Sequence, residues 1–331
     1  MVTRSLENII NGLSISTKIL GFHISGFKTV VVYGDMNGFI YERIQGEIPE
    51  NLDFLEAFDA LCSQVDKLLK ICRAQRLSNP EVISVAISGP VETSTGVVLA
   101  PPDLPNWGDA QLKGRLGVRY NLPVLIEHRS NAAALAEYHF GAGVGVENLI
   151  FIDLEPVVSA GLIVGGSIYR GANHAAGDIG HMRFTSEGPS GLGLPGSLTG
   201  YASGLGMAEL AQLRYPKRWP RGLSPYHLIK AAKAGESEAL AVVAEAADPL
   251  GQALLWLIYS VDPEMVIFGH PGDLLGEVLL QPLRDAILRY GGTLARQLPR
   301  LNVSKLGTKL DDTAALMAVI DAFKRRKMKS G

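Results

Sequence analysis

The sequence predicts an α/β protein in which strands alternate with helices along most of the chain. Three observations carry this prediction: two groups of short strand-like segments, a helical pattern after each group, and a mostly helical C-terminal part. The 331 residues are 47% hydrophobic and 19% charged. This composition excludes a disordered or fibrous chain, and the length allows two domains.

The N-terminal strands form a predicted β-meander after a short polar lead. Residues 19–24, 29–33 and 39–43 read as strands, and the Gly, Asn and Asp residues between them are typical of hairpin turns. Residues 52–76 carry apolar side chains three and four positions apart, which predicts an amphipathic helix. The apolar run 82–87 predicts a buried strand.

The same alternation is then repeated. A strand is predicted at residues 122–127 and an alanine-rich helix at residues 131–140. A second β-meander follows at residues 148–154, 161–164 and 167–169. No short-period repeat is present.

The C-terminal part is predicted to be helical around one strand at residues 265–268. The predicted helices lie at residues 204–213, 226–234, 236–260, 273–289 and 312–325. Strands between helical layers complete the α/β pattern.

Composition narrows the classes of function. The formal net charge is −2, so the chain as a whole lacks the basic character of a nucleic-acid-binding protein. The basic run 324–329 is more simply a solvated helix end. Two cysteines, Cys62 and Cys72, cannot form a disulfide framework or a cysteine metal site. With no stretch of membrane-spanning length expected, we predict a soluble cytoplasmic protein.

Two local patterns are candidates for chemistry. Residues 191–196 spell a dinucleotide-binding glycine pattern, but no apolar strand precedes them, which argues against that function. His174, Asp178 and His181 cluster at spacings of four and three, which would suit a metal ion or loop histidines bonded to backbone. The residues alone favour the backbone interpretation. No Walker A sequence or nucleophile elbow occurs.

Several motifs, in order along the chain, resemble those of the ROK family of bacterial sugar kinases and sugar-responsive repressors. Residues 171–181 end in Gly-Asp-Ile-Gly-His and resemble the family signature Ala-Gly-Glu-Ile-Gly-His. Residues 127–137 resemble its Glu-Asn-Asp-x-Asn-Ala-Ala-Ala-Leu-Ala-Glu motif, and residues 105–107 match its tryptophan motif. Smaller matches occur at Gly26 and at residues 88–90, 141–143 and 262–264. The similarity extends from Ile19 to Phe323.

The resemblance implies an actin-like ATPase (ribonuclease H-like) fold in which two α/β domains flank a cleft. The expected smaller domain comprises residues 19–128 with a returning C-terminal helix at 310–326. The expected larger domain comprises residues 129–309, and residues 1–18 form a lead. Family kinases bind ATP and Mg²⁺ on one side of the cleft and a hexose on the other, and family members commonly form homodimers.

The residue at the position of the family's catalytic base differs in this chain. In family kinases an aspartate of the Glu-Asn-Asp motif takes the proton from the sugar hydroxyl, and this chain has Arg129 there. A guanidinium stays protonated, so it cannot act as a general base. No catalytic residue is therefore expected.

The loop that would face the nucleotide phosphates differs as well. Where the family has Gly-Thr-Gly-x-Gly, this chain has Glu155 and Pro156. Proline has no amide hydrogen to donate, and the glutamate places negative charge against the phosphates. Gly269 belongs to the same degenerate nucleotide site.

The first strand turn has lost its support for Mg²⁺ and phosphate. The family's Asp-x-Gly-Gly-Thr becomes His23, Gly26 and Phe27 with their neighbours, so imidazole replaces a carboxylate and phenyl replaces a hydroxyl. Parts needed for phosphoryl transfer are therefore missing in three places. Neither ATP nor Mg²⁺ is expected as a cofactor.

The family's zinc loop has lost its thiolates. Its Cys-x-Cys-Gly-x-x-Gly-Cys pattern is recognisable from residue 190 onward, with Ser190, Leu192 and Ser197 at the cysteine positions. His181 is the one ligand that remains of four, and one imidazole cannot hold a structural zinc ion. No zinc is expected, and packing is expected to hold the loop.

The sugar side keeps polar residues and gains basic ones. The expected ligand-binding residues are Asn106, His128, Arg129, His174, Asp178, His181 and Thr199. If they converge on one pocket, the basic members suit an anionic ligand such as a sugar phosphate or a sugar acid. The alternative is drift in an unused site, with Arg129 paired to a nearby carboxylate.

Two classes of function follow from these residues. The first is a catalytically inactive protein that binds a sugar or sugar derivative and acts in regulation, comparable to the sensor half of ROK repressors. Those repressors carry an N-terminal winged helix, whereas fewer than twenty residues precede the first strand here, so direct DNA binding by this chain is not expected. The second is an active, glucokinase-like enzyme with ATP and Mg²⁺, using Asp153 or Asp178 as a non-standard base.

Overall fold

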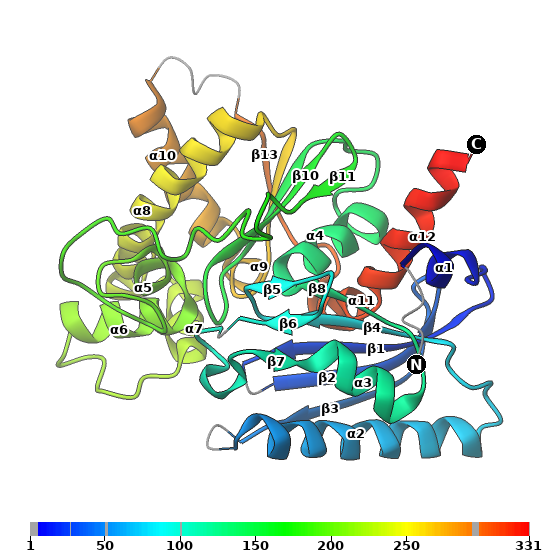
Figure 1. Cartoon of the computed structure of the whole chain (residues 1–331). Coiled ribbons are helices and arrows are strands. Elements are labelled where there is room, and N and C mark those ends of the chain that lie inside the picture. The colour runs from blue at the N-terminus through cyan, green and yellow to red at the C-terminus, as the bar shows by residue number, and fades with distance from the viewer. Residues whose placement is uncertain (1–5, 27, 50–51, 100, 293–297, 331) are drawn as a thin grey trace. The chain divides into compact units, whose positions relative to one another are not determined.

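The chain divides into two compact units, each an α/β structure around its own sheet (Figure 1). The computed structural model describes residues 6–26, 28–49, 52–99, 101–292 and 298–330. Unit 1 comprises Met1–Ala136 and Thr308–Gly331, and unit 2 comprises Glu137–Gly307. The division falls inside helix α4 (Arg129–Phe140), whereas the sequence placed it after residue 128.

Unit 1 is built on a five-stranded sheet of order β3-β2-β1-β4-β8. Its strands are β1 (Lys18–Ser25), β2 (Lys28–Asp35), β3 (Ile40–Glu47), β4 (Val82–Ile87) and β8 (Val124–His128). The first three form the predicted antiparallel meander, and β4 pairs in parallel with both β1 and β8. The carboxyl ends of β1, β4 and β8 therefore meet at one edge of the sheet.

Different helices cover the two faces of this sheet. They are α2 (Phe54–Ala74), α3 (Leu112–Tyr120), α11 (Leu310–Ala314) and α12 (Met317–Ser330). Side chains alternate along β1, so Phe22 joins the core beneath α2 and α3 while His23 points to the α11 side. Asp53 and Glu56 form a capping box that fixes the start of α2.

Several short elements of unit 1 have no signature in the sequence. They are α1 (Leu6–Asn11), β5 (Val91–Glu92), β6 (Val97–Val98), η1 (Pro105–Trp107) and β7 (Ala110–Gln111). Strands β5, β6 and β7 form a separate three-stranded sheet. Elements of two to six residues are too short for a periodic pattern to reveal them.

Unit 2 is built on a sheet of order β11-β10-β9-β12-β13. Its strands are β9 (Leu149–Asp153), β10 (Ser159–Val164), β11 (Ser167–Tyr169), β12 (Met265–Phe268) and β13 (Arg300–Val303). β9 and β12 are parallel neighbours, so the loops that follow them leave the same edge of the sheet. In α/β sheets this edge is where ligands bind.

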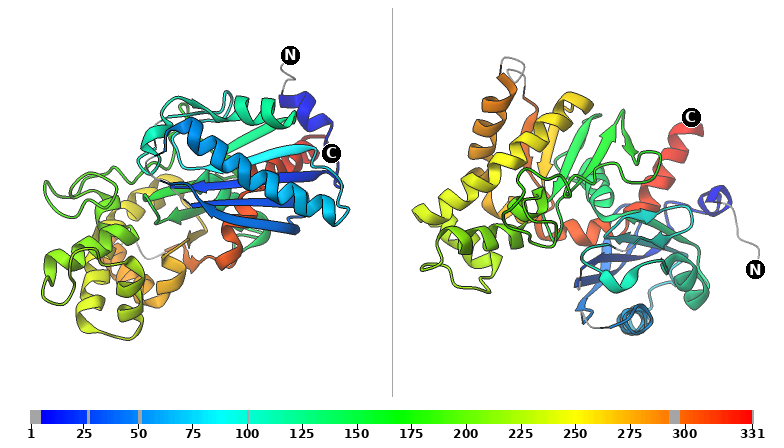
Figure 2. Two further views of the ribbon diagram at one scale, coloured as in Figure 1. Left: turned by 90° about the horizontal axis from the view of Figure 1, so that it is seen from below. Right: turned by 60° about the vertical axis from the view of Figure 1, so that its left-hand side comes forward.

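The helices of unit 2 are α5 (Leu198–Ala202), α6 (Gly204–Arg214), α7 (Pro225–Lys233), α8 (Ser237–Val261), α9 (Gly272–Leu275) and α10 (Glu277–Gly291). α8 and α10 pack against each other, and Figure 2 shows α5, α6 and α7 gathered beside α8. The helix predicted at residues 273–289 is broken at Gly276, whose positive φ of 57° suits glycine. The helix predicted at 312–325 is likewise divided between α11 and α12.

Helix α8 is long and apolar enough to span a membrane by length and composition, contrary to the expectation that no stretch would be. It is the one such helix among the described residues, and 61% of its most apolar window is buried. Val243, Leu250 and Leu254 lie in the core of unit 2. These properties are those of a core helix.

Candidate functional site

The start of helix α4 brings three of the predicted site residues together in unit 1. His128 ends β8, Arg129 begins α4, and His23 lies on β1. Arg129 and His23 are both only 5% exposed. A Cβ on Gly89 would come 2.2 Å from His128 Cδ2, so the His128 ring packs directly against the Gly89 backbone.

Both histidines of this cluster are neutral at physiological pH. Burial lowers the pKa of His128 to about 3, and the positive charge of Arg129 contributes to that shift. Burial also lowers the pKa of His23, opposed in part by Asp311 and reinforced by Arg129. The His23 Nε2 lies 3.6 Å from Asp311 Oδ1. Arg129 is therefore the permanent positive charge of the cluster.

A buried carboxylate positions the residues on either side of Arg129. Glu127 is 2% exposed, and its Oε1 accepts the His128 N–H at 3.0 Å and the Asn131 Nδ2–H at 2.9 Å. Hydrogen bonds to a charged acceptor are among the strong ones. They fix the junction between β8 and α4, and with it the place of Arg129.

A second buried carboxylate lies behind the turn between β1 and β2. Asp103 Oδ2 accepts the Gly26 N–H at 2.7 Å and the Ser88 Oγ–H at 2.5 Å, and Asp103 is 3% exposed. No motif or periodic pattern in the sequence distinguishes this aspartate. Phe27, predicted as part of the degenerate nucleotide site, lies outside the described residues.

The predicted ligand residue Asn106 lies in η1 of unit 1. It is exposed, and its Nδ2 donates a hydrogen bond to the Leu52 carbonyl at 3.1 Å. The next residue, Trp107, is buried and packs edge-on against Phe54, with 5.1 Å between ring centroids. The tryptophan thus anchors the segment that presents Asn106.

Three further predicted ligand residues share one loop of unit 2. Asp178 and His181 are exposed, with 3.8 Å between Asp178 Oδ1 and His181 Nε2. His174 is partly buried and has a left-handed backbone with φ 56°. A Cβ on Gly180 would come 2.3 Å from the carbonyl oxygen of Val158, so the loop packs directly against the backbone just before β10. The loop holds Asp178 and His181 side by side.

The loop at residues 190–199, predicted to correspond to the zinc loop of the ROK family, is held by a carboxylate. Glu209 on α6 accepts hydrogen bonds from the main-chain N–H groups of Ser190 and Gly191, both at 2.9 Å. Arg183 donates to main-chain carbonyls within the same region. Within the described ranges, no group of three or more His, Cys, Asp or Glu residues could hold a metal ion.

The remaining positions of this loop serve the fold in different ways. Ser197 is the N-cap of α5, and its Oγ accepts the Gly200 N–H at 3.1 Å. Thr199 is fully buried, and its Oγ1 accepts the Val158 N–H at 3.2 Å. Leu192 is 37% exposed. The Thr199 hydroxyl thus holds Val158, the residue that precedes β10, by a hydrogen bond to its backbone.

Acidic side chains line the loops that follow β9 and β12. Glu155 Oε2 lies 3.7 Å from His270 Nε2, and His270 Nδ1 lies 3.2 Å from Asp273 Oδ1. A Cβ on Gly204 would come 2.1 Å from Glu155 Oε1, which places this carboxylate against the first turn of α6. The positive end of a helix favours a negative charge there. Pro156 follows and contributes no N–H.

The ends of β9 and β12, beneath these loops, are tightly packed against each other. The Gly269 N–H donates to the Ile152 carbonyl at 2.8 Å, and a Cβ on Gly269 would come 2.6 Å from Phe151 Cζ. Asp153 is 7% exposed and accepts the Glu155 N–H at 3.4 Å. Asp153 therefore lies at the base of the Glu155 loop.

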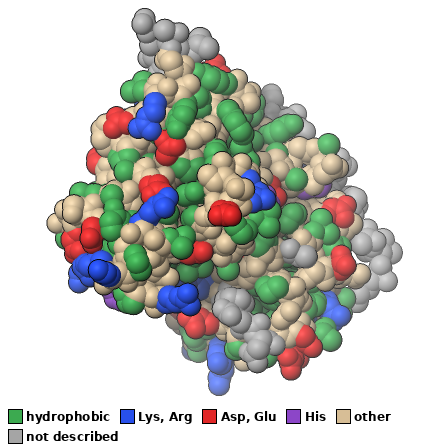
Figure 3. Space-filling model, turned by 90° about the vertical axis from the view of Figure 1, so that its left-hand side faces the viewer, with side chains coloured by type: hydrophobic (Ala, Val, Ile, Leu, Met, Phe, Trp, Pro, Cys, Tyr) green, Lys and Arg blue, Asp and Glu red, His purple; other side chains and the backbone are tan. Residues whose placement is uncertain are grey.

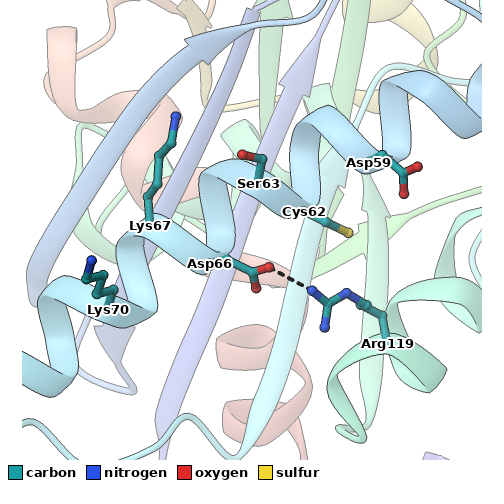
Figure 4. Close-up of a pocket in the computed structure, with 7 residues that line it drawn as sticks. All are labelled: Asp59, Cys62, Ser63, Asp66, Lys67, Lys70 and Arg119. Atoms are coloured by element: carbon teal, nitrogen blue, oxygen red, sulfur yellow. Dashed lines mark hydrogen bonds and ion pairs between the residues drawn. The ribbon is translucent and has the colours of Figure 1, made fainter.

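A surface groove of about 430 Å³ between α2 and α3 is distinct from all these groups. Figure 4 shows its lining residues, which are Asp59, Cys62, Ser63, Asp66, Lys67, Lys70 and Arg119. Arg119 Nη2 lies 2.7 Å from Asp66 Oδ2, and burial raises the pKa of the Cys62 thiol. None of the predicted ligand residues lines this groove.

Comparison with known proteins identifies the family of this chain. The model of the ROK family matches residues 23–324. The chain belongs to the ROK family. This membership confirms the resemblance of the sequence motifs and the predicted fold class.

The relatives include both kinases and repressors. A glucokinase of Halalkalibacterium halodurans is 31% identical over 68% of this chain and 72% of its own length. A xylose repressor of Caldicellulosiruptor bescii is 29% identical over 68% of this chain, and the match spans 58% of the repressor. The chain thus matches only part of that repressor's length.

Two solved ROK structures have the same fold. The Streptomyces griseus glucokinase, solved with glucose and AMPPNP, has a TM-score of 0.78 at 27% identity, covering 93% of this chain and 99% of the kinase. A ROK transcriptional regulator homologous to the E. coli MLC protein has a TM-score of 0.82 at 21% identity, covering 99% of this chain and 87% of the regulator. At that identity the second likeness concerns the fold alone.

The predicted ligand residues of this ROK protein fall into two groups. Asn106, His128 and Arg129 belong to unit 1, and His174, Asp178, His181 and Thr199 belong to unit 2. The convergence of the two groups on one ligand stays a prediction.

Proposed function

We propose that this ROK protein binds a sugar or sugar derivative without phosphorylating it and acts in regulation. The observation that carries the proposal is Arg129, buried at the start of α4 where the family motif has its catalytic base. A guanidinium cannot accept a proton. Its neighbours His23 and His128 have lowered pKa values, which makes both imidazoles weak bases.

Two internal carboxylates support the loss of phosphoryl transfer. Asp103 accepts the Gly26 N–H at the β1–β2 turn of unit 1, and Glu155 lies against the first turn of α6 in unit 2. Gly26 and Glu155 belong to the turns that face phosphates in the family pattern, and Asp103 contacts the first of these turns from the segment that follows β6. A triphosphate at either turn would meet a negative charge where a kinase offers N–H donors.

The remaining polar residues support a carbohydrate ligand. Asp178 and His181 are exposed and adjacent, which suits hydrogen bonding to sugar hydroxyls. The permanent charge of Arg129 favours a sugar acid or a sugar phosphate, because a guanidinium binds carboxylate and phosphate in a bidentate manner. A glucokinase and a xylose repressor among the relatives support a sugar, in the broad sense, as the ligand. We also propose that the protein is a cytoplasmic homodimer.

A thermal-shift panel tests ligand binding. We expect millimolar sugar acids or sugar phosphates to raise the melting temperature, and Mg²⁺-ATP to leave it unchanged. Arg129→Ala should abolish the response to the anionic sugars, while Arg119→Ala, a half-exposed arginine on α3, should not. If hexoses, amino sugars, sugar acids and sugar phosphates all fail to stabilise the wild-type chain, the proposed ligand class is wrong.

The alternative function is an active glucokinase-like enzyme. The 31% identity to a glucokinase favours it, and Asp178 beside His181 offers an exposed carboxylate as a non-standard base. This alternative predicts that Mg²⁺-ATP binds and that Asp178→Asn abolishes sugar phosphorylation. The absence of nucleotide binding in the thermal-shift panel would exclude it.

A further inference from the structure

The end of helix α6, the loop after it and helix α7 form a basic part of unit 2. Residues 210–235 contain six lysine and arginine residues and one histidine, but no aspartate or glutamate. The whole chain, by contrast, has a formal net charge of −2. The six basic residues are all exposed, and they are Arg214, Lys217, Arg218, Arg221, Lys230 and Lys233.

Two of the arginines are neutralised by carboxylates of the segment that forms α8. Arg214 Nη2 lies 2.5 Å from Glu245 Oε1, and Arg218 Nη2 lies 2.7 Å from Glu236 Oε2. The Arg218 guanidinium also lies 4.3 Å from the ring centroid of Trp219, which is only 4% exposed. These contacts attach the loop between α6 and α7 to the core of unit 2.

The other four cations have no acidic neighbour of this kind. Within the part of the chain that the structure describes, no ion pair joins a carboxylate to Lys217, Arg221, Lys230 or Lys233. Exposed cations that lack carboxylates around them produce a positive potential, which attracts a negatively charged partner. This part of the surface therefore carries positive charge that the chain itself does not neutralise.

Helix α7 presents an aromatic ring beside two of these cations. Tyr226, Lys230 and Lys233 are four and three residues apart, so they share one face of the helix. Leu228 and Ile229 lie on the buried side. Tyr226 is 62% exposed, and exposed tyrosines commonly become anchors of interfaces. We call Tyr226 and the four unpaired cations the α7 patch.

The extent of the α7 patch suits a short acidic segment better than a nucleic acid. Helix α7 has nine residues and is about 14 Å long. A nucleic acid carries phosphates well beyond such a length, where the net charge of −2 gives it no further attraction. Figure 3 shows acidic side chains among the basic and apolar ones on the side that it draws. A peptide needs only a few carboxylates for the cations and one apolar side chain for Tyr226.

We infer that the α7 patch binds an acidic segment of a partner protein. Carboxylates of the segment pair with the cations of α7 and of the preceding loop, and an apolar side chain of the segment covers the Tyr226 ring. The two arginine pairs with α8 hold the loop in place before the partner binds. The inference is independent of the sugar ligand and of the absence of phosphorylation.

Fluorescence anisotropy with a labelled peptide tests this contact. The probe is a fluorescein-labelled peptide of three Glu-Leu-Glu-Glu-Ala repeats, and its control has glutamine in place of every glutamate. At 50 mM NaCl we expect the full chain to bind the acidic peptide at least about tenfold more tightly than the glutamine peptide. Raising NaCl to 300 mM should weaken binding, because salt screens exposed charges.

Charge reversal on α7 identifies the surface that binds the peptide. The double variant Lys230→Glu, Lys233→Glu should weaken binding at least about tenfold, because two attractions become two repulsions. Tyr226→Ala should weaken it several-fold. The matched control is Lys67→Glu, Lys70→Glu, which reverses two exposed lysines with the same spacing on α2 of unit 1 and should leave the affinity unchanged.

Three results would overturn the inference. The first is equal affinity for the acidic and the glutamine peptide. The second is an effect of the double variant on α7 no larger than that of the double variant on α2. The third is tighter binding of a 20-residue oligothymidine than of the acidic peptide, which would indicate a nucleic-acid surface. Far-UV circular dichroism checks folding, and if the α7 variant does not fold, Arg221→Glu takes its place in the comparison.

Discussion

Replacing Glu209 by alanine should destabilise unit 2 by releasing the loop at residues 190–199. The carboxylate accepts two consecutive main-chain N–H groups, those of Ser190 and Gly191, at 2.9 Å each. A hydrogen bond to a charged group contributes about 1.5–3 kcal/mol. Because these residues are partly exposed, each bond falls near the lower end, and we expect Glu209→Ala to cost about 3 kcal/mol in total.

Thermal unfolding followed by circular dichroism measures this loss. For a unit of this size, 1 kcal/mol corresponds to a shift of about 2–4 °C, so the melting temperature should fall by about 6–12 °C. Glu187→Ala, an exposed glutamate just before the loop, is the control and should change stability by less than about 0.5 kcal/mol. Glu209→Gln retains one acceptor oxygen and should lie between the two. Equal melting temperatures for Glu209→Ala and Glu187→Ala would refute the role of these hydrogen bonds.

Three further predictions concern activity, pH and metal. Arg129→Asp alone should not produce sugar phosphate, because the carboxylates of Asp103 and Glu155 remain at the phosphate turns; product detected by mass spectrometry would refute this. The pKa of His128 near 3 lies below the ordinary value of 6.5, so the unfolded chain binds more protons between these values. The free energy of unfolding should therefore decrease as the pH is lowered below about 6.5. This residue contributes up to about 1.4 kcal/mol per pH unit to the decrease. In urea unfolding at pH 7, 6 and 5, the free energy of unfolding of His128→Asn should decrease less with falling pH than that of the wild-type chain. An equal decrease in both would contradict the attribution of this pH dependence to His128. Dialysis against EDTA should leave the melting temperature unchanged, and a fall of several degrees would point to a bound metal ion.

The long elements could be predicted because their apolar patterns extend over several turns or strand positions. The meander of β1 to β3, the helix α2 and the core helix α8 all follow the expected segments within a few residues. The break at Gly276 was not predicted, because glycine inside a helical pattern is compatible with both a continuous and a divided helix. Short strands such as β5 and β6 leave no periodic signal at all.

The candidate site was predictable only where neighbours in the sequence are neighbours in space. His128 and Arg129 are consecutive, so a match to one motif placed both. Asp103 and Gly26 are far apart along the chain, and their hydrogen bond depends on how the segments after β1 and β6 meet. Glu209 is likewise an ordinary helix residue in the sequence, and its role appears only when α6 packs beside the loop.

Sugar-dependent ADP release is the most direct test of the central claim that this ROK protein binds its ligand without phosphorylating it. The wild-type chain would be assayed with Mg²⁺-ATP and a panel of hexoses, amino sugars, sugar acids and sugar phosphates, with ADP formation coupled to NADH oxidation. Arg129 at the base position and Glu155 at the phosphate loop predict that no sugar raises ADP formation above the rate without sugar. Sustained sugar-dependent turnover, with the corresponding phosphorylated sugar identified by mass spectrometry, would contradict the account.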